Sequence, residues 1–206
     1  MGEDKPQRVS AERGHRWFAA SYERKSRRSE HTDETRTLRT RVAGDAEGRT
    51  LEIGAGTGFN FSYYPDRASV VATEPDPEML RRAEPRAEEH GIELRLAPAE
   101  RLPFADASFD TVVSTGVFCS VDDPTKALAE VHRVLRPGGT IRFWEHTRAE
   151  GAGRRVVQRA FDPLHHRLFR CHIGRDTLRF MEETGFHIVE LERLRHADVI
   201  GVARKR

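Results

Sequence analysis

The sequence predicts an α/β fold: a mostly parallel, seven-stranded sheet with helices on both faces, closed by a C-terminal antiparallel hairpin. Three observations predict it. Short apolar runs alternate with helical patterns from residue 49 onward, which is typical of βαβ units. A glycine-rich turn at residues 54–58 directly follows the first apolar run. The last two apolar runs are too close together for a crossover helix, so they must pair antiparallel.

The first 45 residues are expected to form an N-terminal helical cover. Residues 10–43 are rich in Glu, Arg and Ala and lack the alternation of a strand, which predicts two helices. Trp17, Phe18 and Tyr22 give the first of them an apolar face. Because such a helix is marginally stable alone, we expect it to dock on the domain that follows and to act as a mobile lid.

Residues 46–206 are expected to form one α/β domain with an insertion at about 147–175. Three helical patterns begin at Pro or end at Gly, and they predict helices at 77–90, 124–135 and 176–183. Seven short apolar runs predict strands at 49–53, 70–73, 92–96, 109–115, 140–145, 186–194 and 199–203.

Composition excludes several classes of protein. The chain has 206 residues, of which 37% are hydrophobic and 33% charged, enough apolar material for one core. Apolar runs are short and the N-terminus lacks a signal-peptide pattern, so we expect no stable membrane insertion and a cytoplasmic location. The net charge is only +2 and no basic stripe is interleaved with aromatics, so no nucleic-acid partner is expected. The sequence leaves the oligomeric state open.

The turn after the first strand is the strongest candidate for ligand binding. Its G-x-G-x-G spacing differs from the G-x-G-x-x-G of nicotinamide-dinucleotide sites. Glu74 follows the second strand, where a carboxylate can accept hydrogen bonds from both hydroxyls of a ribose. The alternatives are a tight turn that binds nothing and a solvent-exposed acid at a strand end.

Four consecutive motifs resemble those of class I S-adenosylmethionine-dependent methyltransferases of the ubiquinone/menaquinone-biosynthesis type. The resemblance runs from about residue 17 to the C-terminus. It implies a Rossmann-like methyltransferase fold, S-adenosyl-L-methionine as cofactor and a small-molecule methyl acceptor. The motifs are LEIGAGTG at 51–58, VVATEPDPEML at 70–80, APAERLPFADASFDTVV at 97–113 and EVHRVLRPGG at 130–139.

The resemblance also implies residue roles. The glycine loop would wrap the methionine portion of the cofactor, and Glu74 would bind its ribose. Pro75 and Met79 would flank the adenine, whose edge would meet residues 99–100. Pro98 stands where many relatives carry Asp. The residues expected to bind the cofactor are Tyr22, Gly54, Ala55, Gly56, Thr57, Gly58, Asn60, Glu74, Pro75, Met79, Ala99, Glu100 and Thr115.

A narrower set of motifs resembles the methyltransferase-like-seven group, whose characterised animal members methylate small thiols. Those members begin with a hydrophobic anchor that this chain lacks, and they usually carry Cys where Ala55 stands. The shared segments are NFSYYP at 60–65, CSV at 119–121, WEH at 144–146, DP at 162–163 and CHIGRDT at 171–177.

Methyl transfer requires an aligned acceptor, a dry site and, for some acceptors, a base. His146 follows the fifth strand and Asp162 lies in the insertion, so both are expected to be catalytic; the alternative for His146 is a capping or core histidine. The chain has no HExxH and no Cys/His spacing of a zinc site, so no metal is expected. Cys119 is read as a buried small hydrophobe or a residue facing the methyl donor, and Cys171 as lid packing or a substrate contact.

The acceptor is expected to be a small, apolar molecule, with a thiol favoured. A thiol has a pKa of about 8.5, so a modest positive field already yields thiolate. Phe161, Leu164, Leu168 and Phe169 have helical spacing and suit a dry pocket, although plain helix packing would need the same pattern. The alternatives are O-, N- or C-methylation, a non-catalytic cofactor-binding scaffold and, disfavoured by the glycine spacing, a nicotinamide oxidoreductase.

Overall fold

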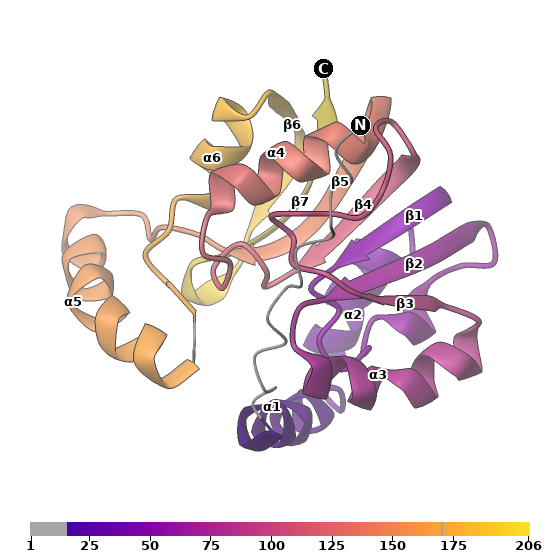
Figure 1. The fold of residues 1–206 in the computed structure, drawn as a ribbon. Helices are drawn as coiled ribbons and strands as arrows, with labels where there is room; N and C mark the ends of the chain where they lie inside the picture. Colours follow the sequence, from indigo (N-terminus) through magenta and orange to yellow (C-terminus); the bar gives the residue numbers. More distant parts are fainter. Residues whose placement is uncertain (1–15, 170) are drawn as a thin grey trace, which may run out of the picture.

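The computed structural model describes residues 16–169 and 171–206. Its centre is a seven-stranded sheet in the order β3-β2-β1-β4-β5-β7-β6 (Figure 1). Strands β1 to β5 run parallel, and β7 is antiparallel to both β5 and β6. The predicted fold class, including the closing hairpin, is confirmed. Residues 1–15 of the expected cover lie outside the described residues.

The strands lie close to where the sequence predicts them, with one difference. The Pro-Gly-Gly that should separate the predicted helix 124–135 from the fifth strand is itself part of β5, which begins at Leu135 beside Phe109 and continues after a register shift. The strands are β1 (Gly48–Ile53), β2 (Ala68–Glu74), β3 (Glu93–Leu96), β4 (Phe109–Thr115), β5 (Leu135–His146), β6 (Phe186–Arg193) and β7 (Asp198–Lys205).

Helix α3 begins and ends where the sequence suggests. The Asp76 carboxylate accepts hydrogen bonds from the first backbone N–H groups of α3, and Gly91 ends that helix at φ 64°. The helices are α1 (Arg16–Ser29), α2 (Asp33–Ala43), α3 (Pro77–His90), α4 (Pro124–Val134), α5 (Ala152–Phe169) and α6 (Thr177–Glu183), with short 3₁₀ turns η1 (Phe61–Tyr63) and η2 (Arg195–Ala197). None of these helices combines the length and the apolar composition needed to cross a bilayer.

The core has two layers because adjacent residues of β4 point to opposite faces of the sheet. Val112 belongs to the cluster that holds Leu128 of α4 and Met181 of α6. Val113 packs instead with Leu38 and other residues of α2. Both valines are fully buried, as expected of a parallel strand covered on both sides.

Helix α1 docks through only part of the apolar face that its aromatic residues predict, because Tyr22 contacts the glycine loop but Trp17 does not pack. Its buried residues are Ala19, Glu23 and Ser26, whereas Trp17 is 81% exposed. Glu23 forms an ion pair of 2.8 Å with Arg86 of α3. A short polar contact therefore holds α1, and the division into cover and domain stays a prediction.

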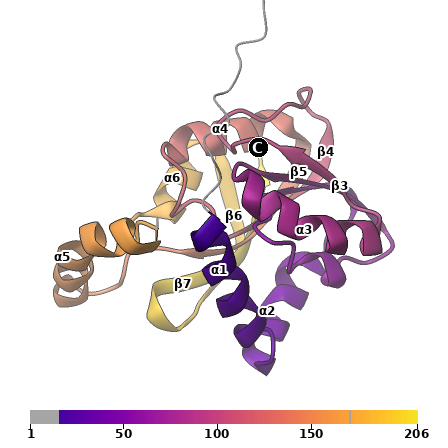
Figure 2. The same cartoon turned by 60° about the horizontal axis from the view of Figure 1, so that its bottom comes forward.

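Helix α5 projects from the body of the protein, beside the hairpin rather than over the sheet (Figures 1 and 2). Phe161 and Leu164 are 58% and 55% exposed. The expectation that these two side chains line a dry pocket is therefore wrong for this structure, because the helix that carries them packs too little against its neighbours. The side chains of Leu168 and Phe169 lie outside the described residues.

Candidate functional site

The glycine loop takes a shape that requires glycine. Gly54 and Gly56 have φ of 58° and 57°, a region that residues with a side chain rarely adopt. A Cβ on Gly54 would lie 2.7 Å from Val117 Cγ2. The N–H of Ala55 donates to Thr73 O of β2 at 2.9 Å, which ties the loop to the neighbouring strand. The loop therefore presents backbone where a side chain would otherwise stand.

Glu74 holds the loop directly. Its Oε2 accepts a hydrogen bond of 2.8 Å from the Gly56 N–H, and its Oε1 accepts one of 2.9 Å from the Asp76 N–H. Glu74 is buried, and this burial raises the pKa of its carboxyl to about 7. Reading Glu74 as a solvent-exposed acid at a strand end is therefore wrong.

A buried network of polar side chains, centred on Asn60 and Glu52, holds the chain that follows the glycine loop. Asn60 Nδ2 donates to Glu52 Oε1 at 2.8 Å and to Thr115 Oγ1 at 3.0 Å, and its Oδ1 accepts from Arg39 at 2.6 Å. Tyr64 donates a further hydrogen bond of 2.8 Å to Glu52. Burial raises the pKa of Glu52 to about 7.

Sequence reasoning missed Glu52 and Arg39. A carboxylate inside an otherwise apolar strand was the signal for Glu52, because an acidic residue is rarely buried without partners. Arg39 gave no signal, because its contacts with Asn60 and with Glu30, which follows α1, depend on how α2 docks. Together they bring charge to the loop from one strand, β1, and one helix, α2.

Tyr22 lies over the loop. Its Cε1 is 3.3 Å from the position that a Cβ on Gly56 would occupy, and burial of its hydroxyl raises its pKa. The cavity left between Tyr22, Thr57, Thr115 and their neighbours measures about 10 Å³, roughly the room for one water molecule. In this structure α1 therefore closes the space above the loop.

The remaining residues expected to bind the cofactor lie at the carboxyl ends of β2 and β3. The Ala97 N–H donates to Glu74 O at 3.2 Å, which joins the ends of these two strands. Met79 and Ala99 are buried, whereas Pro75 is exposed. Glu100 Oε1 accepts hydrogen bonds from the Asp122 and Asp123 N–H groups at 2.9 and 3.4 Å, so this carboxylate holds the turn before α4.

The expected catalytic residues, His146 and Asp162, lie in different settings. Asp162 Oδ2 lies 2.9 Å from His172 Nδ1, and its Oδ1 accepts a 2.9 Å hydrogen bond from the Gly174 N–H. Although burial acts to raise it, these two hydrogen bonds lower the pKa of Asp162. Both carboxylate oxygens therefore hold the segment after α5 in place.

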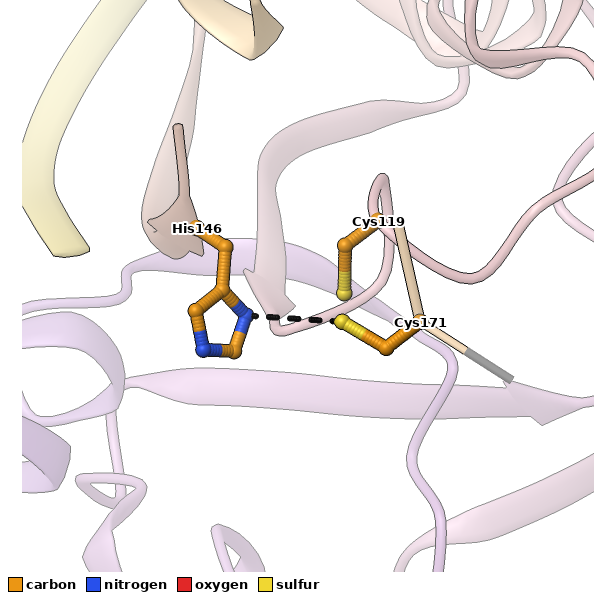
Figure 3. Close-up of side chains that lie close together, drawn as sticks. All are labelled: Cys119, His146 and Cys171. Atoms are coloured by element: carbon orange, nitrogen blue, oxygen red, sulfur yellow. Dashed lines mark hydrogen bonds between the residues drawn. The ribbon is translucent and has the colours of Figure 1, made fainter. Parts of the chain in front are cut away.

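His146 stands at the end of β5 beside two thiols (Figure 3). Its Nδ1 lies 3.9 Å from Cys171 Sγ, and its Nε2 lies 3.3 Å from Asp198 Oδ1. A hydrogen bond with Cys119, opposed by burial, raises the pKa of His146 to about 9. The hydrogen bond between the thiols raises the pKa of Cys119 and lowers that of Cys171. A merely capping or core histidine, the alternative given for His146, would not account for its contacts with two thiols and a carboxylate.

A cavity of about 690 Å³ lies between α5 and the segment that follows it. Besides Asp162 and His172, it is lined by four arginines: Arg148, Arg155, Arg159 and Arg175. Arg175 donates hydrogen bonds to the carbonyls of Phe118 and Val121, which fixes it beside the loop that carries Cys119. The cavity is therefore basic where the arginines gather, but Ala152, Val156 and Pro163 also line it, so its wall is mixed where the sequence suggested a purely apolar pocket.

Comparisons with known proteins agree with the motifs. Residues 51–143 match the family model described as a methyltransferase domain. The chain is 38% identical over 149 residues to a thiol S-methyltransferase, TMT1B, of Rattus norvegicus, which covers 69% of this chain and 61% of that protein. It is 36% identical over 151 residues to human thiol S-methyltransferase TMT1A, covering 70% and 62%. The chain thus spans about three fifths of the length of these curated relatives.

Solved structures share the fold. A SAM-dependent methyltransferase of Thermotoga maritima superposes with a TM-score of 0.69 at 22% identity, covering 93% of this chain and 100% of that one. An S-adenosylmethionine-dependent methyltransferase from Mesorhizobium loti gives 0.64 at 21% identity, covering 85% and 99%. With the family match and the curated relatives, the conclusion is that this chain belongs to the S-adenosylmethionine-dependent methyltransferases.

Proposed function

We propose that this chain transfers a methyl group from S-adenosyl-L-methionine to the sulfur of a small thiol. The observation that carries the proposal is the glycine loop, which Glu74 holds by accepting a hydrogen bond from the Gly56 N–H, in a chain related to thiol S-methyltransferases. A cytoplasmic location and the absence of a nucleic-acid partner remain predictions from composition.

The residues around the loop fit this cofactor. A Cβ at Gly54 would clash with Val117, so only glycine lets the loop pack this closely against the segment after β4. Glu52 and Glu74 are buried carboxyls with pKa values raised to about 7, and a positively charged ligand would favour their ionised forms. When bound, the cofactor supplies a methyl group on a positively charged sulfur. The proposed cofactor-binding set remains the one expected from the sequence, with Glu52 and Arg39 supporting it.

The cover must move for a ligand to enter. Tyr22 fills the space above Gly56, and little room is left beside it. Helix α1 is held mainly by polar contacts such as that between Glu23 and Arg86, which water can replace. We infer that α1 opens to admit the cofactor and closes to exclude water from the reacting atoms.

The basic cavity favours a thiol over a phenol or an amine. Four arginines line it. Nearby positive charge lowers the pKa of either acid, but a thiol starts from about 8.5 and a phenol from about 10, so the same field leaves more thiolate than phenolate. His146 is the better placed of the two expected catalytic residues, since Asp162 uses both oxygens to hold residues 172–174. We propose Asp162 as a positioning residue.

Calorimetry with S-adenosylhomocysteine and with NAD tests the cofactor. We expect S-adenosylhomocysteine alone to bind, and tighter binding of NAD would contradict the proposal. A methyl-transfer assay on matched thiol, phenol and amine acceptors tests the substrate class. Turnover of phenols without turnover of thiols would refute thiol methylation, and binding without turnover of any acceptor would favour a non-catalytic scaffold.

A further inference from the structure

The cluster of Cys119, His146 and Cys171 has a ligand chemistry that methyl transfer alone does not explain. Its members come from the loop after β4, the end of β5 and the segment after α5. Their sulfur and nitrogen atoms face one another (Figure 3) and all lie within 4.8 Å of one another. Within residues 16–169 and 171–206, it is the one group of three such side chains close enough to share a metal ion.

The separations suit a tetrahedral ion of the zinc type. With Zn–S of about 2.3 Å and Zn–N of about 2.0–2.1 Å, two ligands of one ion lie about 3.6–3.8 Å apart. His146 Nδ1 and Cys171 Sγ are 3.9 Å apart. Small rotations of the side chains would therefore bring the three atoms to coordination distance without moving the backbone.

A second observation points to a ligand on His146. Its other ring nitrogen, Nε2, lies 3.3 Å from Asp198 Oδ1. His146 and Asp198 are register partners in the antiparallel pair of β5 and β7, so the sheet itself fixes this contact. A histidine that binds a metal through one nitrogen usually donates from the other to a carboxylate, which orients the ring.

The cluster is closed on one side and open on the other. Cys119 and Cys171 are 2% and 8% exposed, whereas the side chain of His146 is 40% exposed. Cys171 is followed by His172, which lines the basic cavity. Three protein ligands with an accessible fourth position are the arrangement of catalytic zinc sites, as opposed to closed structural ones.

We propose that Cys119, His146 and Cys171 bind a zinc ion through Sγ, Nδ1 and Sγ, and that the fourth position takes the thiolate of the acceptor. The second half rests on the proposed function. Each cysteine loses its S–H proton to solvent on binding the ion, and the acceptor does the same when its sulfur becomes the fourth ligand. No oxidation state changes, since Zn²⁺ has no redox chemistry. The proposal replaces the expectation of no metal and makes His146 a ligand.

Local spacing could not reveal this site, because its ligands are separated by 27 and 25 residues along the chain. Two sulfurs and one imidazole favour zinc over magnesium or calcium, which prefer oxygen ligands.

Metal titration of the full chain tests the first half. The metal-free protein is kept reduced with a phosphine, its two free thiols are counted, and Co²⁺ is added. We expect one ion per chain, a near-ultraviolet sulfur-to-cobalt charge-transfer band, and displacement by Zn²⁺ with release of protons. Absence of the band in protein with both thiols reduced would overturn the proposal.

Variants locate the site. Cys119→Ala, Cys171→Ala and His146→Ala should each weaken Co²⁺ binding at least 100-fold, while His187→Ala, an exposed histidine on β6, should bind as the natural chain does. Asp198→Asn should weaken Zn²⁺ binding about 10–100-fold without changing the Tm of the metal-free protein. An unchanged band in both cysteine variants would place the metal elsewhere and overturn the assignment.

The second half has its own readout. A small thiol added to the Co²⁺ protein should shift the charge-transfer band, and the matched phenol should not; a band unmoved by the thiol would overturn this half. Protein that binds Co²⁺ but not S-adenosylhomocysteine would refute the proposed function and leave the metal site standing. Protein that binds S-adenosylhomocysteine but not Co²⁺ would refute the metal site alone.

Discussion

The glycine loop after β1 and the insertion after β5 both follow the carboxyl ends of parallel strands, yet they are built in opposite ways. At the glycine loop, a short stretch of chain folds on itself and buried groups such as Glu74 and Asn60 hold it with backbone and side-chain hydrogen bonds. At the insertion, α5 stands away from the sheet with Phe161 and Leu164 exposed. The preorganised glycine loop suits a constant ligand, and the loosely packed insertion suits a variable one.

The largest difference in stability and cofactor affinity should appear when one glycine of each region is replaced by alanine. Gly54→Ala puts a Cβ 2.7 Å from Val117 at a positive φ, so we expect a loss of about 2–4 kcal/mol of stability and at least a tenfold loss of S-adenosylhomocysteine affinity. Gly153→Ala meets no atom within 4 Å on α5 and should stabilise slightly. Urea unfolding measures the stability of the two variants, and calorimetry measures their affinity for S-adenosylhomocysteine. Equal losses in both variants would contradict the difference between the two regions.

Glu74→Gln should weaken cofactor binding by about 1.5–3 kcal/mol, the contribution of hydrogen bonds to a charged acceptor. Glu88→Gln, an exposed position on α3, is the matched control. If the two variants bind S-adenosylhomocysteine alike in calorimetry, Glu74 serves only to shape the loop.

The buried carboxyl of Glu52 should make stability depend on pH. Burial raises its pKa from 4.5 to about 7, while Tyr64, Asn60 and Arg39 oppose the shift and Glu74 adds to it. The folded state then binds more protons than the unfolded state between about pH 4.5 and 7, so stability falls as pH rises through that window, by at most about 1.4 kcal/mol per pH unit for one group. Glu52→Gln should reduce the slope of the profile measured by urea unfolding, while Glu74 and Glu145, whose pKa values burial also raises to about 7, keep the remainder. An unchanged slope would contradict the assignment.

The smallest change in folding stability is expected for substitutions on α5. Phe161→Ser and Leu164→Ser remove exposed side chains and should change stability by less than about 0.5 kcal/mol. Leu128→Ala, which empties a fully buried position of α4, should cost about 2–5 kcal/mol. Thermal unfolding of the three variants measures the contrast. A large loss from either serine variant would mean that α5 packs more tightly in solution.

The glycine loop and the elements next to it could largely be predicted, because the residues that determine them are close together in the sequence. Helix 77–90 was predicted with the ends that α3 has, since Pro77 and Gly91 mark both ends. The start of β5 was misplaced because a Pro-Gly-Gly sequence that stops a helix can still lie within a strand, here in the register shift between the Phe109–Leu135 and Thr111–Thr140 pairs. The docking of α1 was predicted only in part: Tyr22 contacts the glycine loop as expected, whereas Trp17 stays exposed and Glu23 instead pairs with Arg86 of α3.

The sequence by itself determined the alternation of strands and helices, the closing hairpin, the glycine loop and the position of Glu74, because periodicity and turn residues act within a few residues of one another. Only the tertiary structure decided that Glu52 joins Asn60 beneath the loop, and that Cys119 and Cys171 meet at His146. Such contacts depend on which strands become neighbours, and a parallel sheet brings together chain ends that no local spacing connects.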